Sequence, residues 1–131
     1  MQPLQHVPAG TLGSATAQTP GMTRLAAISA STAGSQGIWM GQTHVAPGTR
    51  SADHHHGASE TAIYIVVGHP AFVYLRGGVE TRIETSPGDY VFVPPYTPHR
   101  EENPSKTDEA LVVIARNTQE AIVVNLPSLR S

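Results

Sequence analysis

Two histidines and a carboxylate lie close together in the stretch Asp53-His-His-His-Gly-Ala-Ser-Glu60. Alternate side chains of an extended backbone point to the same face, so His54 and His56 share one face while His55 faces the other way. Two imidazoles and the carboxylate of Glu60 can therefore converge on one point. Nitrogen and oxygen ligands of this kind bind divalent transition metals.

A third histidine, His99, follows a stretch rich in proline. The segment Tyr90-Val-Phe-Val93 suits a strand, and Pro94-Pro-Tyr-Thr-Pro98 then ends it, because proline cannot donate to a β ladder. The prolines predict a rigid corner, and His99 is held just beyond it.

The elements that must position these residues are strands. Strand-like segments recur about every 8 to 12 residues, and no stretch shows a sustained helical period with caps, which predicts an all-β sandwich or barrel. The Gly77-Gly78 pair predicts a tight hairpin turn. The predicted strands cover residues 23–30, 37–46, 71–75, 79–84, 90–93, 109–115 and 120–125, with a further buried strand after the histidine stretch.

The composition excludes several classes of protein. The chain of 131 residues has no cysteine, so disulfides, thiolate zinc sites and cysteine nucleophiles are excluded. Its net charge of -2, with scattered Lys and Arg, argues against a nucleic-acid partner. The longest apolar run, residues 62–67, is too short to span a membrane, and the first residues do not resemble a secretory signal. We therefore expect a soluble cytoplasmic protein.

Two segments resemble the paired motifs of the cupin superfamily, as found in small single-domain cupins with one conserved barrel. The first motif is a Gly, five residues, His-x-His, three or four residues, Glu, then about six residues and Gly, and it is matched by Gly48, His54, His56, Glu60 and Gly68. The second motif is a Gly, five residues, Pro-x-Gly, two residues, His, three residues and Asn, and it is matched by Gly88, Pro94, His99 and Asn103. The resemblance covers about residues 37 to 125.

The resemblance implies a double-stranded β-helix, or jelly-roll barrel, with little helix and commonly dimeric. Residues 22–131 would form this single cupin barrel domain, and residues 1–21, rich in Pro, Gly, Ala, Ser and Thr, a flexible N-terminal arm. The metal ligands that the resemblance implies are His54, His56, Glu60 and His99.

The sequence departs from the family pattern at two places. Seven residues rather than six separate Glu60 from Gly68, which predicts a bulge in the strand between them. Tyr96 stands where the second motif usually has a glycine, at the corner before His99.

A physical argument for the metal stands beside the resemblance. A barrel interior excludes water, and histidines with an ionised carboxylate are costly to bury unless they are paired. A divalent cation removes this conflict. Three imidazoles and one carboxylate suit Fe, Mn, Ni, Cu or Zn, and an octahedral ion keeps two positions open for water or substrate. We therefore expect one divalent transition metal ion per chain, of undetermined identity.

Three functions are compatible with this pattern. The first is a small metalloenzyme acting on a small organic substrate, with dioxygenase, isomerase, lyase or cyclase chemistry, in which Glu60 or a bound water moves a proton. The second is a non-catalytic module that binds or senses a small molecule. The third is a protein whose metal serves stability alone, which is disfavoured because an apolar core would be as stable without buried charge. We favour the metalloenzyme.

Candidates for the substrate-binding wall come from strand alternation and from the resemblance. They are Trp39, Thr43, Leu111 and Val113. Their side chains predict a mostly apolar substrate. The remaining histidines, His6, His44 and His69, are expected to be ordinary surface or core residues.

Overall fold

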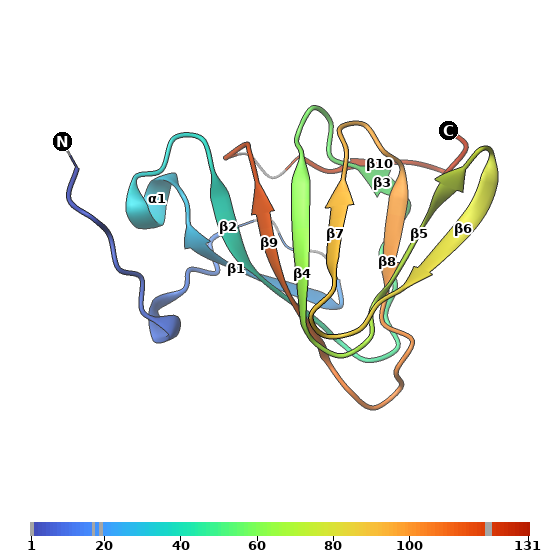
Figure 1. The fold of residues 1–131 in the computed structure, drawn as a ribbon, viewed down its shortest axis with the longest axis horizontal. Helices are drawn as coiled ribbons and strands as arrows, with labels where there is room; N and C mark the ends of the chain where they lie inside the picture. The colour runs from blue at the N-terminus through green and yellow to red at the C-terminus, as the bar shows by residue number, and fades with distance from the viewer. Residues whose placement is uncertain (1, 17, 19, 120–121) are drawn as a thin grey trace.

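The computed structural model describes residues 2–16, 18, 20–119 and 122–131, and nearly all of its regular structure is β (Figure 1). In chain order, the elements are η1 (Ala9–Thr11), β1 (Met22–Ile28), α1 (Ala30–Ala33), β2 (Trp39–Val45), β3 (His54–His55), β4 (Thr61–Val67), β5 (Ala71–Arg76), β6 (Val79–Glu84), β7 (Tyr90–Val93), β8 (His99–Glu102), β9 (Ala110–Arg116) and β10 (Val124–Asn125). Among the described residues, no helix is long and apolar enough to cross a bilayer.

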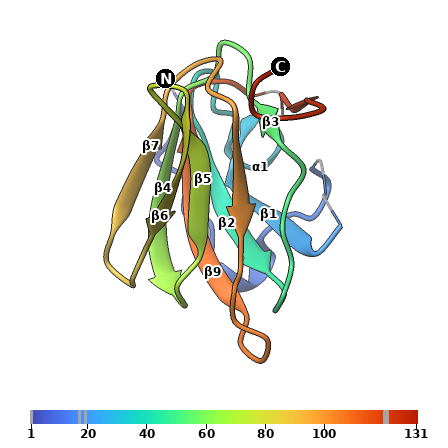
Figure 2. The same ribbon diagram turned by 90° about the vertical axis from the view of Figure 1, so that its right-hand side faces the viewer.

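The strands form two five-stranded sheets. The first sheet has the order β1-β2-β9-β4-β7, and the second sheet has the order β10-β3-β8-β5-β6. All the pairings described within them are antiparallel. The two sheets lie face to face and enclose the interior between them (Figure 2). This arrangement is a jelly-roll barrel and confirms the predicted fold class.

Strand alternation selects the side chains of the core. In β2, Trp39 and Val45 are buried on the inner face, whereas Met40 on the outer face is 41% exposed. The same alternation buries Ile63 and Ile65 in β4. The main core cluster consists of Ala26, Trp39, Ile63, Ile65, Phe72, Val93, Val112 and Ile114.

Two local predictions are confirmed. Gly77 and Gly78 join β5 to β6 with φ values of 57° and 80°, as a two-residue hairpin turn with positive φ at both positions requires. The register of β4 against β9 shifts between Ile65 and Val67, which is the bulge expected from the extra residue before Gly68.

Other features differ from the sequence-based prediction. Strand β8 begins at His99, where only a corner was expected, and a short helix α1, capped by the hydroxyl of Ser29, follows β1. Of the strand predicted over residues 120–125, residues 120 and 121 lie outside the described residues, and β10 covers only Val124–Asn125. Within the described part of residues 1–21, Gly13 pairs with Ala26 of β1. The flexible arm and the domain boundary after it stay predictions.

Gly41 occupies a position on the inner face of β2 where a side chain has no room. A β-carbon there would press against the carbonyl oxygen of Leu25 and lie 2.6 Å from a ring carbon of Trp39. We expect Gly41→Ala to lower the free energy of unfolding by about 1–3 kcal/mol, because the backbone or the indole must move. Urea denaturation measures this, with Gly37→Ala as the matched control, since nothing lies within 4 Å of that β-carbon. Equal stability of the two variants would contradict the packing described for β2.

Candidate metal centre

Three histidines converge inside the barrel from two neighbouring strands. His54 of β3 lies directly opposite His99 of β8 in the ladder, so both side chains point to the same face of the second sheet. His56 follows two residues after His54 and joins them. Ligand atoms of the three residues lie within 4.8 Å of one another, and the rings of His54 and His99 are 4.5 Å apart between centroids. The structure thus brings together three of the four predicted ligands.

Backbone carbonyls orient all three imidazoles. The Nδ1 atom of His54 lies 2.6 Å from the carbonyl oxygen of Ala52. The Nδ1 of His56 lies 2.8 Å from that of Ile122, and the Nδ1 of His99 lies 2.9 Å from that of Thr97. A carbonyl oxygen only accepts hydrogen bonds, so each Nδ1 carries the proton when the ring is neutral. Each Nε2 is then left with a free lone pair, as a metal ligand requires.

One buried ring nitrogen of the three histidines lacks a hydrogen-bond partner within the described part of the chain. The Nε2 of His99 is buried and has no hydrogen-bond partner among the described residues. Burying such an acceptor without a partner is unfavourable, and native structures seldom do so without a reason. A metal ion at the point shared by the three rings would satisfy it, so these residues fit a metal site.

The electrostatics of the site keep the histidines neutral. Burial lowers the pKa of His54, and the nearby His99 lowers it further. Burial also lowers the pKa of His99, and it lowers the pKa of His56 from 6.5 to about 4. Neutral imidazole is the form that coordinates metals, so at neutral pH no proton has to be displaced for an ion to bind.

Two cavities of different character adjoin the histidines. A small polar cavity of about 30 Å³ is bounded by His54, His56 and Thr61, among others. Since one water needs roughly 10–15 Å³ measured in this way, the space suits an ion or a water and excludes an organic molecule. A larger cleft of about 410 Å³ reaches His99 from the other side and is walled mainly by apolar side chains such as Phe72 and Val91.

The structure does not bring Glu60 to the three histidines. Ser59 and Thr61 are both buried and line the polar cavity, so Glu60 between them points outward and is exposed. Its backbone N–H donates to Oδ1 of Asn117 at 3.0 Å. The inward-facing positions are therefore Ser59 and Thr61, each one residue away from the position that the motif implied, Glu60. A ligand role for Glu60 stays a prediction from the motif, without support from this geometry.

The predicted substrate-binding residues are also distributed differently. Leu111 and Val113 lie on the outer face of the first sheet, because the ladder places them opposite His44 and Gln42 of β2. Trp39 is buried in the core, with the guanidinium of Arg116 3.9 Å from its ring centroid. Thr43 does face the interior, where its Oγ1 has no partner among the described residues, and its role at a substrate stays a prediction.

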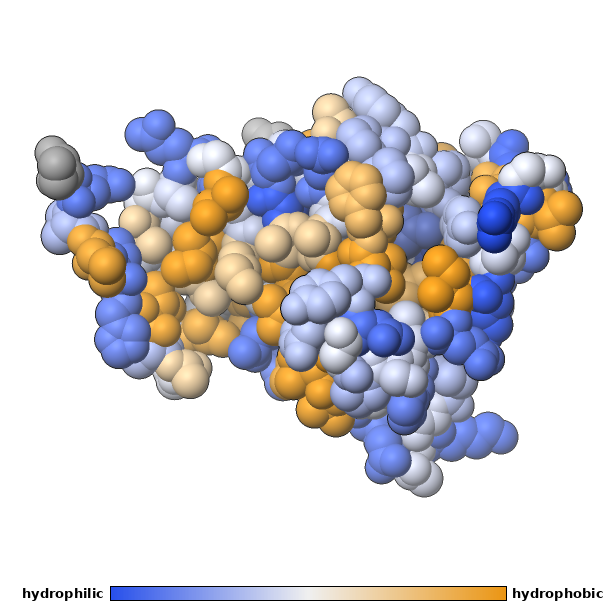
Figure 3. Space-filling view, viewed as in Figure 1, coloured by the Kyte–Doolittle hydropathy of each residue, from blue (hydrophilic) through white to orange (hydrophobic). Residues whose placement is uncertain are grey.

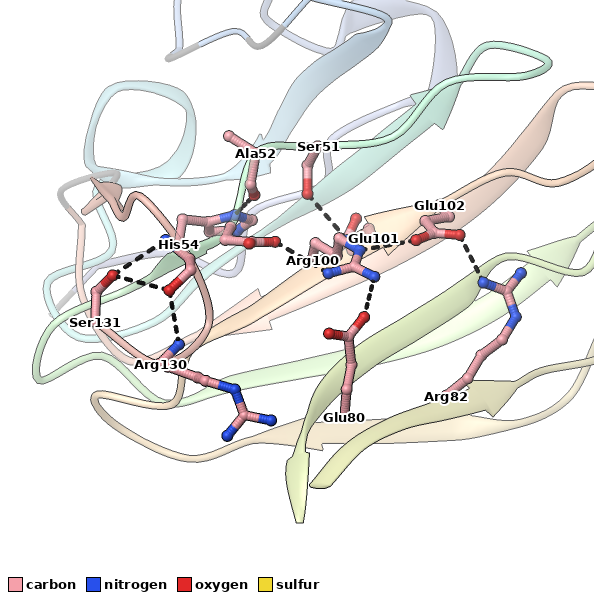
Figure 4. Close-up of polar contacts among 12 residues, drawn as sticks. Ser51, Ala52, His54, Glu80, Arg82, Arg100, Glu101, Glu102, Arg130 and Ser131 are labelled. Atoms are coloured by element: carbon pink, nitrogen blue, oxygen red, sulfur yellow. Dashed lines mark hydrogen bonds and ion pairs between the residues drawn. The ribbon is translucent and has the colours of Figure 1, made fainter. Parts of the chain in front are cut away.

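The residues after His99 alternate between the two faces of β8. Arg100 points outward and donates to Glu102 at 2.8 Å, Asp53 at 3.4 Å and Glu80 at 2.5 Å (Figure 4). These ion pairs raise the pKa of Arg100 and hold its guanidinium on the outer face. Glu101, between Arg100 and Glu102, instead lines the polar cavity beside His54 and His56. Sequence reasoning missed Glu101 because the segment was not predicted as a strand.

The corner before His99 adopts the backbone conformation for which the motif's glycine is suited. Tyr96 has a φ of 57°, and it is the one described residue other than glycine with a positive φ. Its N–H donates to the carbonyl oxygen of Gly57 at 2.8 Å, which ties the corner to the loop after His56. Asn103 is buried, and its amide donates to the backbone carbonyls of Val45 and Asp108.

The fold is a jelly-roll barrel whose interior gathers three histidines that could hold a metal ion. The chain belongs to the cupin family, since the family model described as "Cupin domain" matches residues 41–115, more than half of the chain. Comparison with curated proteins gave no match.

Solved structures with this fold include the polyketide cyclase RemF from Streptomyces resistomycificus. It is 19% identical, with a TM-score of 0.74, and the match covers 94% of this chain and 85% of that chain. Oxalate oxidase in complex with glycolate is 22% identical with a TM-score of 0.70, and the match covers 83% of this chain and 57% of that chain. Oxalate decarboxylase from Bacillus subtilis is 21% identical with a TM-score of 0.70, and the match covers 83% of this chain and 28% of that chain. At these identities the likeness concerns the fold.

The lowered histidine pKa values predict how the metal-free protein responds to acid. In the unfolded chain a histidine titrates near 6.5, whereas folded His56 titrates at about 4. Between these values the unfolded state binds more protons, so the stability of the metal-free protein should fall as the pH drops from 7.5 to 5.5. Thermal unfolding at the two pH values measures the loss. This loss of stability should be smaller in His56→Gln. A loss as large as that of the wild type would show that His56 is not its source.

Proposed function

We propose that the protein is a metal-dependent enzyme acting on a small, mostly apolar organic molecule. The observation that carries this proposal is a group of three inward histidines, among which His99 has an Nε2 that no described residue satisfies and lies at an apolar cleft. The chemistry is of the dioxygenase type, or of the isomerase, lyase or cyclase type. A non-catalytic binding module would use the same cleft and is the alternative that the assays must separate.

The roles of the residues follow from their positions. His54, His56 and His99 hold the ion. When bound, such an ion supplies a Lewis acid or a site for activating dioxygen. The cleft of about 410 Å³ is within the usual range for small-molecule sites, and Phe72, Tyr74 and Val91 on its walls would orient an apolar substrate and exclude water.

The character of the cleft favours one kind of substrate over another. RemF is named as a polyketide cyclase, and oxalate oxidase is named for oxalate. Oxalate is a small dianion, for which an apolar wall of aromatic side chains provides no complementary charge. We therefore place aromatic and polyketide-like compounds ahead of oxalate as candidate substrates.

Elemental analysis of the untagged protein tests the proposal first. We expect about one transition metal ion per chain, since three imidazoles suffice for a catalytic site with open positions. The reloaded Fe(II) and Mn(II) forms are then assayed for oxygen uptake and for product formation with aromatic and polyketide-like compounds and with oxalate. Binding without turnover would favour the non-catalytic alternative. A site that remains empty after reloading would overturn the proposal.

His99→Ala should abolish or strongly reduce metal binding while leaving a folded barrel, because it removes the ligand with the unsatisfied Nε2. Metal content and circular dichroism of the purified variant measure the two effects. His69→Ala is the matched control, since the exposed His69 lies outside the three-histidine group. Full metal content in His99→Ala would show that this histidine is not a ligand.

We also propose that the protein forms a homodimer through the outer face of the first sheet. Several apolar residues from three strands are exposed there, including Met40 at 41%, Val66 at 37%, Tyr90 at 79% and Phe92 at 59%. Leu111 and Val113 lie on the same face, and apolar residues gather over the left and centre of Figure 3. Exposed apolar surface of this kind marks interaction sites. In a twofold-symmetric dimer, this patch of one subunit would pack against the same patch of the other subunit.

Phe92→Asp should convert the dimer to a monomer, because it places a charge in an apolar contact. Sedimentation velocity at several protein concentrations measures the change. Val79→Asp is the control, since Val79 is 66% exposed on β6, in the second sheet. A wild-type protein that sediments as a monomer at all concentrations would contradict this assembly.

A further inference from the structure

Glu101 places a carboxylate at the cavity beside the histidines, whereas Glu60, the carboxylate of the motif, is exposed. It lies two residues after His99 on β8, so the two side chains share the inner face of the second sheet. The ladder places Glu101 opposite Phe72, which is buried in the core. Its side chain lines the small polar cavity together with His54 and His56.

The backbone of Glu101 is held on both sides. Its N–H donates to the hydroxyl of Ser51 at 2.9 Å, and its carbonyl oxygen accepts from the N–H of Ser51 at 2.8 Å (Figure 4). Ser51 is buried, three residues before His54. The carboxylate of Glu101 and the ring of His54 are therefore positioned by the same piece of backbone.

The side chains that line the cavity are mostly basic or neutral, so a carboxylate there can balance positive charge. Among the described residues that line it, Glu101 is the one acidic side chain, and Arg24 and Arg116 line it as well. Burial raises the pKa of Glu101, whereas the nearby His54 and Arg24 act in the opposite direction. A divalent ion held by neutral imidazoles keeps its full charge, and a carboxylate in the adjoining cavity would reduce the unfavourable charge inside the barrel.

We propose that Glu101, rather than Glu60, is the carboxylate of the metal centre. Glu101 does not belong to the group of ligand atoms that lie within 4.8 Å of one another, so it acts from beyond the three histidine ligands. It balances the charge of the ion and accepts a hydrogen bond from a water bound on the side of the polar cavity. This inference rests on the proposed metal-dependent function and identifies the residue that orients the water.

The exposed Glu60 and the inward Glu101 allow a matched test. Glu101→Gln keeps the size of the side chain and removes its charge, and Glu60→Gln makes the same change on the outer surface. Co(II) is titrated into each metal-free protein at pH 7.5 by calorimetry. We expect Glu101→Gln to bind Co(II) about 10 to 100 times more weakly than the wild type, as is usual when a carboxylate next to metal ligands is lost. Glu60→Gln should change the affinity by less than about twofold, since solvent screens an exposed charge.

Glu101→Asp tests whether the charge of Glu101 acts on the metal ion or whether its side chain only supports the fold. It restores the charge with a shorter side chain, so it should bind Co(II) more tightly than Glu101→Gln does. Thermal unfolding of the metal-free variants reports on folding independently. Unchanged affinity in Glu101→Gln, or an equal loss in Glu60→Gln, would overturn the inference. A wild-type protein that binds no metal would instead overturn the proposed function itself.

Discussion

The candidate metal centre depends on the pairing of β3 with β8. The two strands bring His54 and His99 into direct opposition, although these residues come from distant parts of the chain. Strand β3 is only two residues long and lies between β10 and β8, so its neighbours determine its position. His56 joins the group because the chain stays extended for two more residues. A change in this register would turn His54 to the other face and would leave no common point for the three rings.

The same centre carries an energetic penalty in the absence of an ion. Three imidazoles are withdrawn from water, held neutral by burial and fixed by backbone carbonyl groups, which are local for His54 and His99 and come from Ile122 for His56. Of the nitrogen atoms turned inward, the Nε2 of His99 has no partner among the described residues. Such an arrangement destabilises the protein until something binds there, so metal binding and folding stability are linked. A metal ion bound by the three histidines would satisfy this atom.

The interior is divided around this centre. The histidines separate a polar cavity of water size from a cleft large enough for an organic molecule. The cavity holds the ionisable side chains Glu101, Arg24 and Arg116, whereas apolar and aromatic side chains wall the cleft. An ion at this boundary would face both environments, with charge and bound water on one side and an apolar molecule on the other. This division favours an enzyme over a purely structural metal site.

The fold class and the three histidines of the candidate metal centre can be predicted from the sequence alone. The His-x-His spacing, the proline corner before His99 and the Gly77-Gly78 turn are local patterns, and the structure places all of them as expected. The alternation of β2 is long enough to identify its inner face without any neighbour. The predicted bulge in β4 followed from a single extra residue.

The tertiary structure alone decided which side chains of the shorter and more apolar strands face inward. Leu111 and Val113 lie in a strand that is apolar on both faces, so only its pairing with β2 shows that they point outward. Glu60 lies at the start of β4, where a difference of one residue in phase turns a side chain from the cavity to solvent. The charged segment His-Arg-Glu-Glu of β8 has no apolar alternation to mark it as a strand, and its ladder with β5 turns Glu101 inward. Residue types and local spacing are properties of the chain itself, whereas strand register is a relation between distant segments and exists only in the folded barrel.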